Sequence, residues 1–70
     1  MMLNKENVST RSVIRIFEIL QLLANHPDGL TLKQIVDGLH RPPKSSVHSL
    51  LQQMVNLRYI AYLESDKKYK

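Results

Sequence analysis

Cysteine is absent from the sequence, and glycine occurs only twice, at positions 29 and 38. A chain without cysteine has no disulfide framework and no thiolate zinc site. Two isolated glycines do not make a phosphate-cradling glycine loop. The longest apolar run is interrupted by Arg15, Glu18 and Gln21, so no run approaches the roughly 20 residues that span a bilayer. We therefore expect no disulfides and no membrane association, and we expect the protein in the cytoplasm.

Seventy residues are enough for one small domain and too few for two. The opening residues 1–8 are polar and aperiodic, which predicts a flexible arm, and residues 9–70 form the predicted domain. His26, His40 and His48 have no spacing typical of metal ligands, and no serine, histidine and acid form a plausible triad. The sequence predicts a protein that is not an enzyme, with no metal and no cofactor.

Three amphipathic segments follow the arm. The first, over about residues 10–25, begins near a cap at Ser9 or Thr10, and its core stripe consists of Val13, Phe17, Leu20 and Ala24 with Ile16 and Leu23. The second starts with a capping box between Thr31 and Gln34 and ends beyond Gly38. The third begins near Pro43 and runs to about residue 57, with a core stripe of Val47, Leu50, Leu51, Met54 and Leu57.

The tail changes from a helical to an alternating pattern. Tyr59–Leu63 and Lys68–Lys70 flank a polar turn, which is typical of a β-hairpin. We assign Tyr59, Tyr62 and Tyr69 to strand packing, with nucleobase stacking as the alternative. Three helices followed by a two-stranded wing predict a mainly helical winged helix-turn-helix.

Negative charge is missing from the second half of this pattern. No carboxylate occurs between Gly38 and Leu63, and all six acids lie outside that segment. The whole chain carries a net charge of +4. Because a phosphate backbone repels carboxylates and attracts lysine and arginine, this distribution favours DNA as the partner.

The exposed side of the third helix has an unusual composition. A solvated helix surface is normally rich in glutamate and lysine, whereas here short hydroxyls and amides prevail. We expect this side to enter the major groove, with base or groove contacts from Ser45, Ser46, His48, Ser49 and Gln52. Contacts to phosphate are expected from Lys44, Arg41, Arg58, Arg15, Arg11, Lys67 and Lys68. For Arg15 the alternative is an ion pair with Glu18, and for the two hairpin lysines it is a solvated turn.

The sequence resembles the isocitrate-lyase-regulator (IclR) family of bacterial transcription factors over about residues 10–70. The resembling stretches are Arg11-Ser12-Val13 through Ile19-Leu20, Leu30-Thr31-Leu32 with Ile35, and Tyr59 with Lys68-Tyr69-Lys70. The most specific one, Pro43-Lys44-Ser45-Ser46-Val47-His48 with Leu50-Leu51, is similar to the family's Pro-x-Ser-Thr-x-His-Arg-Leu-Leu start of the recognition helix. The resemblance implies a regulator that binds a double-stranded operator as a homodimer or higher oligomer. It further implies a small-molecule effector bound by a C-terminal domain that this chain lacks, so we expect an excised DNA-binding domain.

The sequence departs from the family at three places. His40-Arg41-Pro42 replaces a Gly-Leu turn, with one residue more, and leaves the angle between the second and third helices open. Ser49 stands where the family often has arginine, and Arg58 stands where it has glycine. If position 58 needs a left-handed backbone, arginine is strained there by about 1 kcal/mol. A winged helix that binds another protein, without DNA binding, is the second hypothesis for this chain.

Overall fold

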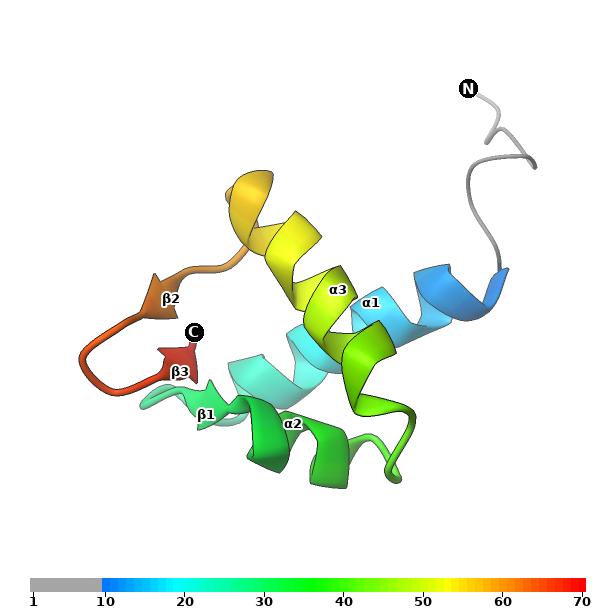
Figure 1. Cartoon of the computed structure of the whole chain (residues 1–70), viewed down its shortest axis with the longest axis horizontal. Coiled ribbons are helices and arrows are strands. Elements are labelled where there is room, and N and C mark those ends of the chain that lie inside the picture. The colour runs from blue at the N-terminus through cyan, green and yellow to red at the C-terminus, as the bar shows by residue number, and fades with distance from the viewer. Residues whose placement is uncertain (1–9) are drawn as a thin grey trace.

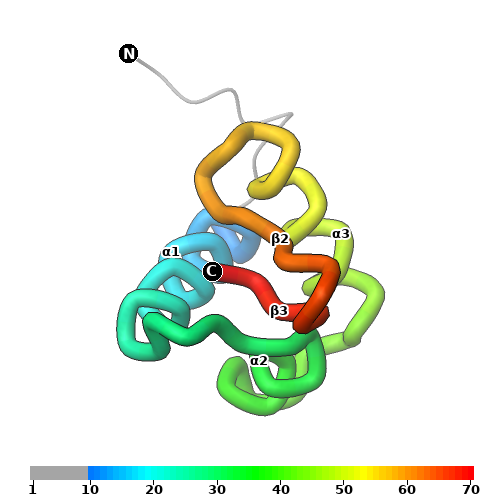
Figure 2. Tube along the Cα trace, turned by 90° about the vertical axis from the view of Figure 1, so that its left-hand side faces the viewer, coloured from blue at the N-terminus to red at the C-terminus, as the bar shows by residue number. Residues whose placement is uncertain are grey.

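The computed structural model describes residues 10–70, so the predicted arm and the cap at Ser9 lie outside the described residues. Three helices pack around one core, and a small sheet covers their end (Figure 1). The elements are α1 (Thr10–Ala24), β1 (Leu30–Thr31), α2 (Leu32–Gly38), α3 (Lys44–Asn56), β2 (Tyr62–Leu63) and β3 (Lys68–Tyr69). The arrangement confirms the predicted winged helix-turn-helix. Viewed from the sheet, α1 and α3 lie on opposite sides of the wing, with α2 below (Figure 2).

The side of α1 that packs into the core agrees with the predicted stripe at Ile16 and Leu23 and departs from it elsewhere. Ile19 and Leu23 are buried and Ile16 packs against them, whereas Phe17 is 64% exposed and Leu20 also lies at the surface. The assignment of Phe17 to the core was therefore wrong. The two stripes differ by one position, or about 100° around the helix, and both satisfy the helical period. Only the neighbouring elements decide which stripe is buried.

The chain leaves α1 through a turn that needs glycine. Nδ1 of His26 lies 2.9 Å from the Leu22 carbonyl oxygen, where an Nδ1–H donates to the open end of the helix. Gly29 then adopts φ of 90°, and a Cβ at this position would lie 2.9 Å from the Tyr69 carbonyl oxygen. Position 29 thus requires both a left-handed backbone and the absence of a side chain.

The capping box at the start of α2 is confirmed. The Gln34 amide N–H donates to the Thr31 hydroxyl at 3.2 Å, and the Thr31 N–H donates to the Gln34 side-chain oxygen at 2.9 Å. At the other end of α2, a Cβ on Gly38 would lie 2.8 Å from a methyl carbon of Leu22. A larger residue at position 38 would therefore require the Leu22 side chain to shift.

Both α2 and α3 end in a Schellman motif closed by a residue other than glycine. After α2, the Arg41 N–H donates to the Val36 carbonyl at 2.9 Å while His40 has φ of 67°. After α3, the Tyr59 N–H donates to the Met54 carbonyl at 2.9 Å while Arg58 has φ of 66°. The condition stated for strain at Arg58, a left-handed backbone, is thus met. The α2–α3 turn contains two consecutive left-handed residues, because Arg41 has φ of 59°.

The wing is part of a three-stranded antiparallel sheet with the order β1-β3-β2. Tyr69 of β3 pairs with Leu30 of β1 on one side and with Tyr62 of β2 on the other. The sequence pattern predicted the β2–β3 hairpin and missed β1, because a two-residue strand has no measurable period. The third strand in sequence order is therefore the central one in space.

The core draws on every element except β2. Ile19, Ile35, Val47 and Leu51 are fully buried and come from all three helices, and Tyr69 of β3 closes one end. The prediction that Leu57 belongs to the core was wrong, because it caps α3 as the chain turns outward and is 65% exposed. Tyr59 lies outside the strands and is exposed as well, which contradicts its assignment to strand packing.

Candidate DNA-binding surface

The outer side of α3 carries a straight row of polar side chains. Ser45, Ser49, Gln52 and Asn56 recur at helical spacing and are exposed, opposite the buried Val47, Leu51 and Met54. All five predicted groove contacts are exposed: Ser45, Ser46, His48, Ser49 and Gln52. The sequence prediction did not include Asn56, one turn further on, although the same spacing continues to it.

The start of α3 is open to an anion. Pro43 precedes the helix and supplies no side-chain cap, and its carbonyl accepts the N–H groups of Ser46 and Val47 at 3.1 and 3.2 Å. The first turn of a helix presents backbone N–H groups and the positive end of the helix dipole. Lys44 and Ser45 stand on this turn, where a phosphate oxygen is stabilised.

A hollow of about 230 Å³ lies where the beginnings of α1 and α3 meet, lined by Arg11, Ser12, Arg15, Pro43, Ser46 and Leu50. The fold thus brings two predicted phosphate contacts, Arg11 and Arg15, to the side of a predicted groove contact. Nε of Arg15 also lies 3.5 Å from a carboxylate oxygen of Glu18, which is half exposed. A surface pair of this kind contributes only about 0–1 kcal/mol, so it is a weak competitor for a phosphate.

A second hollow, of about 470 Å³, joins α2 to α3 and is lined by Leu32, Lys44, Ser45 and His48. Lys44 and His48 therefore share one side of the α3 start, away from the two arginines of α1. Leu32 of α2 lines this hollow and also packs against the core cluster. It therefore lies between the hollow and the core.

The remaining predicted phosphate contacts are spread over three segments. Arg41 is exposed in the α2–α3 turn, with Nε 3.7 Å from a carboxylate oxygen of Asp37. Arg58 is exposed beyond α3, and Lys67 is exposed in the wing turn with φ of 55°. Lys68 is half-buried in β3, between Thr31 and Leu63.

The hollows that border α3 share one electrostatic property. Four of them lie along the helix, and none is lined by an aspartate or a glutamate. The sequence segment without aspartate or glutamate thus contributes to each of these four hollows. Such a surface attracts polyanions and offers no local repulsion to them.

The described residues hold neither a cluster of metal ligands nor a membrane-spanning helix. Among residues 10–70, no three histidine, cysteine, aspartate or glutamate side chains lie together as metal ligands do. The helices of the same part of the chain include none that is long and apolar enough to cross a bilayer.

Comparison with protein families identifies the domain. Residues 12–64 match the IclR helix-turn-helix domain, which covers α1 through β2 and most of the chain. This chain belongs to the IclR helix-turn-helix family. The IclR domain is the DNA-binding part of a transcription regulator, and proteins of this type are typically not enzymes. No curated protein and no solved structure gives a significant match.

Proposed function

We propose that this IclR-type domain reads operator DNA by placing α3 in the major groove of the duplex, as part of a bacterial regulator acting in the cytoplasm. The observation that carries the proposal is the exposed row of hydroxyl and amide side chains on α3, bordered by hollows without carboxylates. Short side chains let the helix backbone approach the bases closely. An ordinary solvated helix gains nothing from this composition, since serine lowers helix stability.

The residues divide into two roles. Ser45, Ser46, His48, Ser49 and Gln52 face the groove, where hydroxyl, imidazole and amide groups meet base edges and the bordering strands. The positive side chains hold the duplex in register through phosphates: Lys44, Arg41, Arg58, Arg15, Arg11, Lys67 and Lys68. Among them, Arg11 and Arg15 are favoured by the hollow that they share with Ser46.

We further propose that two copies of the chain bind one operator. Ile14, Phe17 and Leu20 leave an apolar strip exposed on α1, and exposed apolar patches mark protein interfaces. Phe17 lies two positions after Arg15, about 200° around the helix, so the strip points away from the arginines that face DNA. A homodimer formed on this strip would read two half-sites, with centres about 34 Å apart if consecutive major grooves are used.

Residues 9–70 act in this proposal as one DNA-binding unit. An effector would change operator affinity through a C-terminal effector-binding domain outside this chain, as the IclR family implies.

Selection of duplexes from a random pool with the purified chain tests the proposal. We expect enrichment of a near-palindromic sequence, and a plot of log affinity against log salt with a slope of about −3.6 per subunit if four phosphates are neutralised. A slope near zero and no enrichment would refute DNA binding and support a domain that binds another protein.

A further inference from the structure

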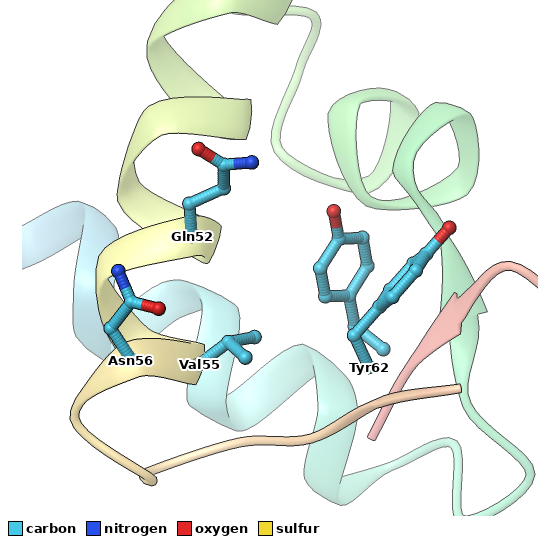
Figure 3. Close-up of a pocket in the computed structure, with 5 residues that line it drawn as sticks. Gln52, Val55, Asn56 and Tyr62 are labelled. Carbon is cyan, nitrogen blue, oxygen red and sulfur yellow. The ribbon is translucent and has the colours of Figure 1, made fainter. Parts of the chain in front are cut away.

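A hollow between α3 and the wing is lined mostly by side chains outside the proposed DNA contacts. This hollow, the wing cleft, has a volume of about 290 Å³. It is bordered by Gln52, Val55, Asn56, Tyr62 and Tyr69. Figure 3 shows Gln52 and Asn56 on successive turns of α3, with Tyr62 standing across the open space from Gln52. Two amides and two phenols thus border one volume.

The wing side of the cleft is held rigidly. Tyr62 and Tyr69 are paired residues of neighbouring strands, and their ring centroids lie 4.8 Å apart. Tyr69 is only 6% exposed, and its burial, with a smaller effect from Tyr62, raises the pKa of its hydroxyl above the usual range. The cleft therefore has a fixed, protonated phenol at its base and the more exposed Tyr62 at its rim.

Positive charge lies next to these neutral donors. A second hollow shares Val55 and Tyr62 with the wing cleft, and Arg58 and Lys70 line it. Neither hollow is lined by an aspartate or a glutamate. Neutral donors beside positive side chains suit a ligand that is negatively charged and accepts several hydrogen bonds.

The length of the α3 row indicates which anion. Ser45 and Asn56 are eleven positions apart, or about 16 Å along the helix axis. The major groove of B-DNA is only about 12 Å wide. When the start of α3 is inserted first, as in helix-turn-helix proteins, the other end of the row passes the base edges and meets the strand that borders the groove.

We propose that the wing cleft seats one phosphodiester of the DNA backbone, with the amide groups of Gln52 and Asn56 and the hydroxyl of Tyr62 donating to its oxygens. This inference rests on the proposed function, because the strand in the cleft is the one bordering the groove that α3 enters. Gln52 is then a positioning contact that is blind to base identity, and base discrimination is confined to the first half of α3.

The variants Asn56→Ala and Tyr62→Phe test the cleft, with Gln53→Ala as a matched control. Gln53 is an exposed amide on the same helix that does not line the cleft. Affinity is measured for the selected operator and for a scrambled duplex of equal length. We expect each cleft variant to weaken both duplexes by about three- to tenfold, which corresponds to one hydrogen bond, and the control to change neither. Gln52→Ala should likewise leave the ratio of the two affinities unchanged.

A scan of the operator with single methylphosphonates, which remove one phosphate charge at a time, locates the contact. For the unmodified chain, a methylphosphonate at one particular phosphate should weaken binding. For Asn56→Ala, the methylphosphonate at that same position should cause little further loss of affinity. A changed affinity ratio for Gln52→Ala, or no effect of Asn56→Ala and Tyr62→Phe while Lys44→Glu still weakens binding, would overturn the cleft assignment and leave the proposed function standing. Absence of DNA binding by the unaltered chain would overturn both.

Discussion

The exposed sides of α1 and α3 both differ in composition from an ordinary solvated helix, but in opposite ways: α3 is richer in neutral polar side chains and α1 in apolar ones. On α3 the outward residues are serines, a histidine and amides, without one carboxylate. On α1 they include Ile14, Phe17 and Leu20, which water disfavours. One helix presents hydrogen-bonding groups without repulsion of polyanions, and the other presents apolar area. These two unlike departures match the two partners proposed above, operator DNA on α3 and a second copy of the chain on α1.

The two sides also respond differently to conditions. Contacts to phosphate weaken as salt rises, since counterions compete for the same charges. Burial of apolar area is not screened in this way. A substitution on the exposed side of α3 should therefore change DNA binding and leave self-association unchanged. A substitution in the apolar strip of α1 should do the reverse.

The largest effect is expected from Phe17→Glu. A charge at the centre of the apolar strip should weaken self-association about 100-fold, or about 2.7 kcal/mol, because the dimer would bury it unpaired. The fold should survive, since Phe17 is mostly exposed. Sedimentation equilibrium measures the association, with Gln53→Glu, exposed on α3 and therefore away from the strip, as the control. Unchanged association of the Phe17 variant would assign the strip to a different partner.

Lys44→Glu should weaken DNA binding about tenfold at 0.1 M salt, for all sequences alike. Reversing one charge at the open start of α3 replaces attraction to a phosphate by repulsion, and the salt slope should fall by about 0.9 because one phosphate fewer is neutralised. Titrations of the operator at several salt concentrations measure both quantities. Lys33→Glu, exposed on α2, is the matched charge reversal, and an equal effect there would show that only net charge matters.

Ser49→Ala should act on specificity. Removal of a hydroxyl from the middle of the row should change the preference at one base pair by about 1 kcal/mol, close to fivefold, and leave the affinity for scrambled DNA unchanged. Competition among operators substituted at each position gives the profile. A uniform decrease at every position would place Ser49 on the backbone instead of a base.

Of the variants expected to affect DNA binding, Arg58→Gly should change it least. It should stabilise the fold although it weakens binding. Glycine relieves the left-handed backbone and should raise the free energy of unfolding by about 1 kcal/mol, while DNA affinity falls about threefold because a positive charge is removed. Arg58→Ala removes the same charge without relieving the backbone. Chemical denaturation of the two variants should therefore differ by about 1 kcal/mol, and equal stabilities would mean that the position carries no strain.

The sequence predicted what local chemistry decides. The Thr31–Gln34 capping box and the polar side of α3 depend on residues near one another in the chain, and the structure confirms them. Phe17 was misplaced because two apolar stripes on α1 fit the same period, and only packing against α2 and α3 selects one. The strand β1 and the wing cleft were missed for a related reason. The strand β1 exists only because it pairs with β3, more than thirty positions later, and the cleft exists only because α3 and the wing meet in space.

The central position of β3 in the sheet has a consequence for the order in which this protein assembles. A ribosome releases all three helices before Tyr69, yet the sheet pairs Leu30 and Tyr62 with that residue and not with each other. Until β3 is available, β1 and β2 have no partner strand, so the whole sheet depends on the last few residues described.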